Sequence, residues 1–172
     1  MSGLLVVYTG NGKGKTTAAL GLCLRAIGHG LKVGFLQFMK GSKEYGEVRM
    51  AANLPGFELL QCGRDSFVSP DQPEEIDIVL ARGGLTTFKT WLTAGKFDLI
   101  VLDEVLVAIA YKLLPIQEVV DILESRSPEV DIVLTGRYAP EEIIQLADTV
   151  TVMSERRHAY QRGAVAKAGM EF

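Results

Sequence analysis

The chain contains 172 residues, 48% of them hydrophobic, which is enough for one domain with a substantial core. With 18 basic and 21 acidic residues, its formal net charge of −3 argues against nucleic acid and anionic membranes as partners. Its two cysteines, Cys23 and Cys62, are too few for a disulfide framework or a cysteine-rich zinc site, so we expect a reduced, cytoplasmic setting. The N-terminal pattern also predicts neither a signal peptide nor a membrane span.

Short apolar runs alternate with longer, helix-like segments along the chain. The apolar runs predict strands at residues 4–9, 32–38, 57–60, 98–102, 131–135 and 149–152. The segments between them predict helices at residues 15–28, 45–53, 74–94, 116–124 and 140–147. Because strands and helices alternate, we expect a single α/β domain over residues 1–172, with a mostly parallel sheet and helices on both faces. Ligands of such sheets bind outside the carboxyl ends of the strands.

A glycine-rich segment joins the first predicted strand to the first predicted helix. It consists of Thr9, Gly10, Asn11, Gly12, Lys13, Gly14, Lys15, Thr16 and Thr17. Backbone N–H groups of such a loop point at phosphate oxygens, Lys15 adds charge for the terminal phosphates, and the Thr16 hydroxyl suits Mg²⁺. The usual pattern begins with glycine where this chain has Thr9. The alternative is a chance glycine-rich turn, but the strand context and the Gly-Lys-Thr ending favour nucleoside triphosphate binding in a P-loop NTPase-like fold.

Two carboxylates, Asp103 and Glu104, follow the strand predicted at residues 98–102. Beside the phosphate-loop strand, Asp103 would reach Mg²⁺ through a water molecule. The alternative is that Asp103 caps the helix that follows. Three roles remain open for Glu104: it polarises a water molecule for hydrolysis, it binds the metal or the ribose, or it is simply exposed to solvent.

Other polar residues follow the predicted strands. Thr135 and Arg137 suit contacts to phosphate or substrate. For Arg137, an ordinary surface position after a turn explains the sequence equally well. Lys40 places a cation at the same rim, and Arg25 is either solvated or reaches back to the nucleotide. The segment 61–73, rich in Gly, Asp, Ser and Pro, is typical of a binding loop or lid.

These motifs together resemble the P-loop ATP:corrinoid adenosyltransferases, also called cob(I)alamin adenosyltransferases. The resemblance is carried, in order, by residues 8–19, 25, 28–30, 37–38, 40–41, 46–47, 98–104, 111, 114–115, 134–137, 147–148, 158, 163, 169 and 171. A phosphate loop alone is shared by many enzymes, whereas this succession is specific and spans the chain.

The resemblance implies that the Co(I) of a reduced corrinoid, cobalamin or a precursor, attacks the 5′ carbon of ATP and that triphosphate leaves. ATP would lie reversed relative to ordinary P-loop hydrolases. Cobalt would be the nucleophile, so the protein would only orient C5′ and stabilise the leaving group. The resemblance also implies a role in cobalamin biosynthesis or salvage, a flavin-dependent reductant as partner, and a homodimer.

The resemblance also implies roles for individual residues. The loop from Gly10 to Thr16 would hold triphosphate, and Thr16 with Asp103 or Glu104 would hold Mg²⁺ or Mn²⁺. Lys15, Glu104 and Arg137 would serve catalysis, and Arg25 would face the nucleotide together with Arg137.

The chain departs from the family pattern at a few positions. Val152 stands where many members have an acidic residue, Arg157 replaces a lysine, and the chain ends in Met170-Glu171-Phe172. Some members place a Phe and a Trp near the corrinoid in the loop at 61–73, whereas this chain has Phe67 and no Trp. We expect Phe67, extended by Val68, to contact the corrinoid; the alternative is that Phe67 anchors the loop to the core.

Two other classes of protein share a phosphate loop. A P-loop kinase for a small hydroxyl compound would need lid arginines near the γ-phosphate, and no arginine-rich lid is evident in the sequence. An ATP-gated binding or motor module would use Asp103 and Glu104 as a hydrolytic pair and would show appreciable ATPase activity.

Overall fold

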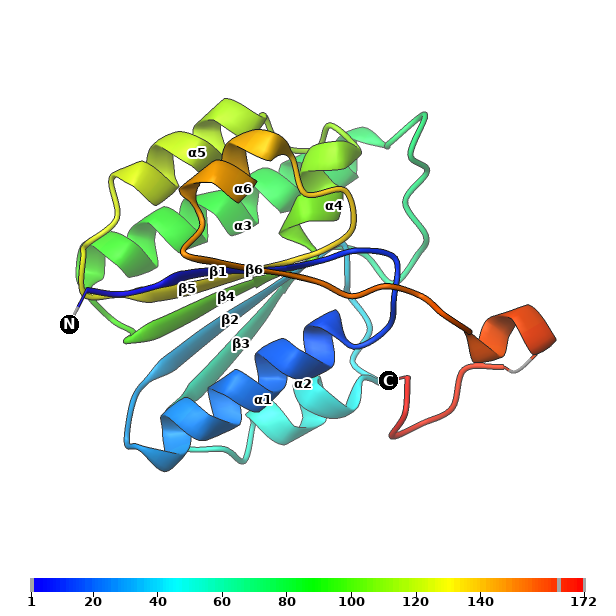
Figure 1. Ribbon diagram of the computed structural model, residues 1–172, viewed down its shortest axis with the longest axis horizontal. Helices are drawn as coiled ribbons and strands as arrows, with labels where there is room; N and C mark the ends of the chain where they lie inside the picture. The colour runs from blue at the N-terminus through cyan, green and yellow to red at the C-terminus, as the bar shows by residue number, and fades with distance from the viewer. Residues whose placement is uncertain (1, 164, 172) are drawn as a thin grey trace.

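The computed structural model describes residues 2–163 and 165–171 and shows a six-stranded sheet with helices on both faces (Figure 1). The strands are β1 Leu5–Thr9, β2 Val33–Phe38, β3 Phe57–Cys62, β4 Leu99–Asp103, β5 Asp131–Thr135 and β6 Thr149–Val152. The helices are α1 Lys15–Gly28, α2 Gly46–Ala51, α3 Glu75–Ala94, α4 Val105–Ala110, α5 Ile116–Glu124 and α6 Glu141–Leu146, followed by a 3₁₀ turn, η1 Ala159–Arg162. Phe172, named above among the departures from the family pattern, lies outside the described residues.

The strands lie in the order β3-β2-β4-β5-β1-β6, and each runs parallel to its neighbours. Parallel neighbours require crossover helices, and these cover both faces of the sheet. Helices α3, α4, α5 and α6 lie on one face and α1 and α2 on the other (Figure 1). This arrangement confirms the predicted α/β, P-loop NTPase-like fold.

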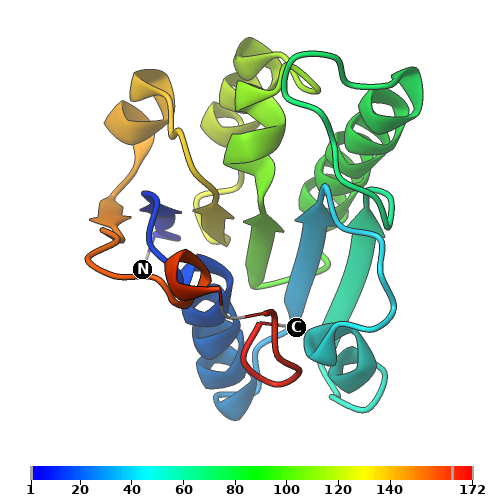
Figure 2. The same ribbon diagram turned by 90° about the vertical axis from the view of Figure 1, so that its right-hand side faces the viewer.

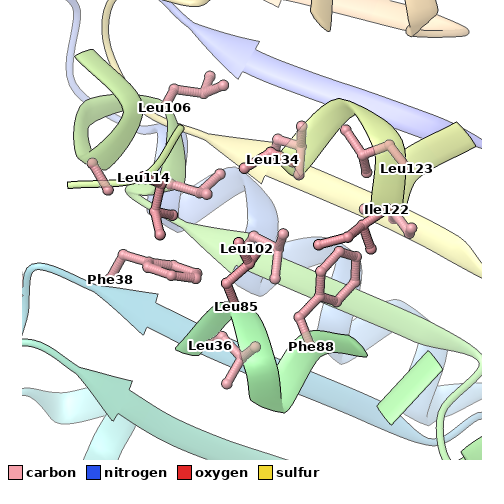
Figure 3. Close-up of a cluster of buried hydrophobic side chains, with 14 of the residues drawn as sticks. Leu36, Phe38, Leu85, Phe88, Leu102, Leu106, Leu114, Ile122, Leu123 and Leu134 are labelled. Atoms are coloured by element: carbon pink, nitrogen blue, oxygen red, sulfur yellow. The ribbon is translucent and has the colours of Figure 1, made fainter. Parts of the chain in front are cut away.

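Burial on both faces explains why the strands are apolar nearly throughout. Every residue of β2 and β4 is buried, including the polar Gln37 and Asp103 near their carboxyl ends. On the α3 side, Phe38, Phe88 and Leu102 point into one cluster that also receives side chains from α4 and α5 (Figure 3). The sheet is therefore a rigid base, and its carboxyl edge can hold side chains in fixed positions.

The predicted strands and helices are present, with ends that differ by at most two residues. The strand predicted to end at residue 60 continues to Cys62, because Gln61 and Cys62 still pair with Gln37 and Phe38 of β2. Helix α4 was not predicted: its sequence VLVAIA is apolar throughout and so lacks helical periodicity. Within the described part of the chain, no helix combines the length and the apolar character needed to cross a membrane.

Candidate functional site

A cavity of about 660 Å³ opens at the carboxyl edge of the sheet, next to the start of α1. This volume lies within the range of small-molecule sites. Its walls come from the phosphate loop, the outer face of α1, the region of α2, the ends of β4 and β5, and the C-terminal segment. Figure 2 looks onto this edge and shows the red C-terminal segment passing in front of α1. The cavity therefore lies where ligands of parallel sheets bind.

Glycine is required in the phosphate loop because the backbone there packs closely. Gly10 has φ 96° and Gly14 has φ 114°, both in the region that disfavours side chains. The Gly12 N–H donates to the Met153 carbonyl oxygen at 2.7 Å, and a Cβ added at Gly12 would lie 2.7 Å from that oxygen. The loop is thus fixed against the segment that follows β6.

Lys15, the lysine of the phosphate loop, folds back onto the loop itself. Its Nζ donates to the carbonyl oxygens of Gly10 and Gly12, both at 2.8 Å. Burial lowers the pKa of Lys15, although the negative charges of Glu104 and Asp103 partly oppose this. A phosphate group in the loop would give this ammonium a stronger, charged partner than two carbonyl groups.

Asp103 is fully buried and accepts three hydrogen bonds. Its Oδ1 accepts from the hydroxyls of Thr16 at 2.9 Å and Thr135 at 2.7 Å, and its Oδ2 accepts from Lys40 Nζ at 2.7 Å. Burial alone would lower the pKa of Lys40, but the Asp103 carboxylate, with Glu104 and Glu47, holds it above its usual value. The two residues predicted to bind the metal, Thr16 and Asp103, are therefore in direct contact.

Thr135 lies behind Asp103 and does not face the cavity. We expected it to contact phosphate or substrate, and this expectation was wrong. It is fully buried; its hydroxyl donates to Asp103 and accepts from the Glu104 N–H at 3.0 Å. Thr135 therefore fixes both carboxylate residues at the end of β4.

Replacing Thr135 with valine keeps the shape of the side chain but removes both hydrogen bonds. The buried Glu104 N–H then has no acceptor at this position, so we expect a loss of about 1–3 kcal/mol in the free energy of unfolding. Denaturant unfolding measures this loss, and Thr135→Ser should recover most of it. A Thr135→Val variant as stable as the wild type would show that these bonds add nothing to the fold.

Glu104 begins α4 in a left-handed conformation, with φ 60°. Such a conformation costs of order 1–3 kcal/mol for a residue with a side chain, and strain of this kind is typical of functional sites. The side chain lines the cavity, and its pKa is raised by burial and by the charge of Asp103. The helix-cap position therefore belongs to Glu104; Asp103 ends the strand instead.

Two more cations border the phosphate loop. Arg137, after β5, is exposed and lines the cavity. Lys13 turns to the C-terminal segment, where its Nζ donates to the Met170 carbonyl oxygen at 2.8 Å and contacts the Glu171 carboxylate. The C-terminal segment is thus held against the loop.

Four of the predicted binding residues lie outside the main cavity wall. Arg25 is exposed on α1, ten residues beyond Lys15, which corresponds to about 15 Å along the helix axis. Thr9 is buried at the end of β1, and Gly10 borders a smaller hollow that Arg137 also lines. Phe67 is 89% exposed, whereas Val68 beside it is only 4% exposed. Val68, not Phe67, therefore anchors the loop, and it does not extend an exposed apolar patch.

One wall of the cavity was not predicted from the sequence. Apolar residues of α1, of the α2 region and of the start of β3 form it: Leu20, Leu24, Tyr45, Met50, Leu54 and Phe57. A helix had been predicted for the α2 region, and its apolar face was the only signal available. The sequence does not show which residues of that face border a cavity, because this depends on how α1 and α2 pack against each other.

Comparisons with known proteins identify the family of this chain. A family model described as ATP:corrinoid adenosyltransferase BtuR/CobO/CobP matches residues 1–172. The corrinoid adenosyltransferase of Escherichia coli (strain K12) is 39% identical over 170 residues, 99% of this chain and 86% of that protein. The corrinoid adenosyltransferase CobA of Salmonella typhimurium is 38% identical over 170 residues, with the same coverage of 99% and 86%.

Among solved structures, a KaiC-like protein from Pyrococcus horikoshii OT3 has a TM-score of 0.59 at 16% identity, covering 92% of this chain and 76% of that one. This likeness concerns the fold alone. The match of the family model to the whole chain, with these two relatives, shows that the chain belongs to the ATP:corrinoid adenosyltransferase family.

Proposed function

We propose that this enzyme transfers the 5′-deoxyadenosyl group of ATP to the Co(I) of a reduced corrinoid and releases triphosphate. In this reaction a bond forms between cobalt and C5′, the bond between C5′ and the α-phosphate oxygen breaks, and its electron pair leaves with the triphosphate. The observation that carries the proposal is a phosphate-binding loop that lines a cavity, in a chain of this family.

The phosphate loop supplies the groups that this leaving group needs. The N–H groups from Gly10 to Thr16, apart from the Gly12 N–H that donates to Met153, bind triphosphate oxygens at the start of α1. Lys15 exchanges its two carbonyl partners for phosphate oxygens, and Arg137 adds a second cation from the end of β5. These charges lie where negative charge develops as the C5′–O bond breaks.

The residues at the end of β4 fit Mg²⁺ or Mn²⁺. The Thr16 hydroxyl and the Asp103 carboxylate are oxygen donors of the kind these ions prefer, and the Lys40 ammonium already places positive charge between them. When bound, the ion neutralises charge on the triphosphate. Glu104, at the same rim, is a further oxygen donor.

Among the residues that the structure describes, none at the cavity is an activated nucleophile. Cys23 lines it, but burial raises the pKa of this thiol to about 12, so it stays protonated at neutral pH. A cobalt nucleophile brought by the substrate removes the need for one. The apolar wall on α1 and α2 offers contacts to the parts of the substrates that carry no phosphate.

The partners complete the proposal. The enzyme would act on cobalamin or a precursor in cobalamin biosynthesis, receive Co(I) from a flavin-dependent reductant, and work as a homodimer in the cytoplasm. These features rest on the family, and size-exclusion chromatography with light scattering tests the dimer directly.

The reaction products test the function itself. The protein is incubated with Mg-ATP and chemically reduced cobalamin, and the nucleotide and phosphate products are separated by ion exchange. Inorganic triphosphate together with adenosylated corrinoid supports adenosyl transfer, whereas ADP indicates a kinase or an ATP-gated module. Omitting the corrinoid is the control, because ATP should then remain intact.

Phe67 is the candidate contact to the lower face of the corrinoid. Its ring is exposed, while Val68 and the ion pairs of Arg64 with Asp77 and Glu74 hold the loop in place. An exposed ring on a fixed loop can pack under a corrinoid and exclude the lower cobalt ligand, which makes Co(I) easier to form.

We expect Phe67→Ala to slow transfer when the assay starts from Co(II) cobalamin and a reductant. It should slow transfer much less when Co(I) is generated beforehand and supplied in excess. Because the ring is exposed, the unfolding temperature should stay unchanged; Val79→Ala, an exposed apolar residue of α3, is the matched control. Equal losses in both assays would show that another segment handles the axial ligand.

A further inference from the structure

Lys40 occupies the position between the two residues proposed to bind the metal. Its Nζ lies 2.7 Å from Asp103 Oδ2 and 3.4 Å from Thr16 Oγ1. It reaches them from the loop after β2, directly after Met39, which has φ 59°. The structure thus places an ammonium group where a hydroxyl and a carboxylate meet.

Asp103 needs a positive partner whether or not a metal is bound. Its side chain is fully buried, and a buried carboxylate without a countercharge is strongly unfavourable. Two neutral hydroxyls, from Thr16 and Thr135, satisfy Oδ1 but bring no charge. Among the described residues, Lys40 is the one that forms a salt bridge with Asp103.

The ammonium and a metal ion compete for this position. A metal bound to the Thr16 hydroxyl lies about 2.0–2.1 Å from that oxygen. It would then share a space of a few ångströms with the ammonium, and two cations at that distance repel strongly. Lys40 has room to leave, because its side chain is 19% exposed, lines the cavity and lies 5.8 Å from the Tyr45 ring centroid.

We propose that Lys40 is a placeholder cation, which balances Asp103 until a divalent metal displaces it and then turns into the cavity. The inference rests on the metal role proposed above for Thr16 and Asp103. A metal ion arriving alone must displace Lys40 without compensation. A metal ion arriving with ATP brings phosphate oxygens that can accept the released ammonium. Lys40 therefore favours loading of metal and nucleotide together.

Binding of Mn²⁺ alone, without nucleotide, tests this inference by calorimetry. We compare the wild type with Lys40→Met, which keeps the length of the side chain but removes its charge. Since the competing cation is gone, Lys40→Met should bind Mn²⁺ at least about tenfold more tightly. Lys89→Met, at an exposed lysine of α3, is the matched control and should bind like the wild type.

Thermal unfolding gives a second readout. Without metal, Lys40→Met should unfold at a lower temperature because Asp103 has lost its partner, and Mn²⁺ should raise that temperature more than it does in the wild type. In Lys40→Met combined with Asp103→Asn, the stability should recover and the response to Mn²⁺ should disappear. If Lys40→Met is too unstable to study, Lys40→Gln replaces it.

Equal Mn²⁺ affinity in Lys40→Met and the wild type would overturn the inference and would make Lys40 a permanent ion-pair partner. This result is independent of the proposed function, because triphosphate release from ATP and reduced cobalamin is measured separately. If the wild type releases triphosphate and Lys40→Met binds Mn²⁺ like the wild type, only the placeholder role of Lys40 is rejected. If the wild type releases no triphosphate but Lys40→Met binds Mn²⁺ more tightly, the proposed reaction is rejected and the placeholder role is retained.

Discussion

Replacing Lys15 with alanine should slow adenosyl transfer by a factor of about 100 to 1,000, the equivalent of about 2.7–4 kcal/mol, as for the loss of one donor to a developing oxyanion. Triphosphate leaves with several negative charges, and the Lys15 ammonium is within reach of the loop that would hold them. Water entering the space left by the side chain supplies no positive charge. The loss should therefore appear in the rate of the chemical step.

The measurement is a single-turnover assay with Mg-ATP and pre-reduced cobalamin at saturating concentrations. Lys89→Ala is the control for loss of a lysine elsewhere, and we expect it to react at the wild-type rate. Thermal unfolding of Lys15→Ala should show only a small change, because the lost bonds to Gly10 and Gly12 are offset by relief of a buried charge. A rate within a few-fold of the wild type would reject the role of Lys15.

The elements of the fold were predictable where their signal is local. Strands buried on both faces are apolar runs, and the glycines of the phosphate loop mark the turn between β1 and α1. Helix α4 was missed for a local reason, since six consecutive apolar residues carry no periodicity. The sequence thus predicted the sheet and the position of the site at its carboxyl edge.

The contacts within the site depend on residues that are far apart in the chain. Asp103 lies 87 residues from Thr16, 63 from Lys40 and 32 from Thr135. Lys40 and Thr135 meet it because β4 lies between β2 and β5, whereas Thr16 reaches it from the start of α1, although β5 separates β4 from β1. The motif pattern predicted a shared role for Thr16 and Asp103. No pattern indicated that Lys40 would contact both Thr16 and Asp103, or that Thr135 would be buried against Asp103.

The loop with Phe67 shows a different limit. Phe67 and Val68 are adjacent apolar residues, and on the sequence alone either could pack inward. The structure buries Val68 and exposes the larger ring, which reverses the usual preference for burying aromatic area. That exposure leaves Phe67 available to a ligand.

Replacing Asp103 with asparagine should mainly weaken the Mg²⁺ dependence of transfer. The amide keeps the size of the side chain and one oxygen, so Thr16 and Thr135 can still donate to it. Its NH₂ group, however, replaces the oxygen that faces Lys40 and carries no charge. Removing a full negative charge from a divalent-ion site should raise the Mg²⁺ concentration needed for half-maximal activity at least about tenfold, since a charge interaction in such a site is worth several kcal/mol.

The effect on stability should be smaller than the effect on activity. Breaking a buried ion pair usually costs about 3–5 kcal/mol because one charge stays buried without a partner. Here the remaining charge belongs to Lys40, which is partly exposed on a flexible stem and can turn towards water, so the unfolding temperature should fall only slightly. Mg²⁺ titrations of the initial rate, with Glu104→Gln measured in parallel, decide between the two carboxylates. If Asp103→Asn titrates like the wild type while Glu104→Gln loses its Mg²⁺ dependence, the metal is held by Glu104, and Asp103 serves only to position Thr16 and Lys40.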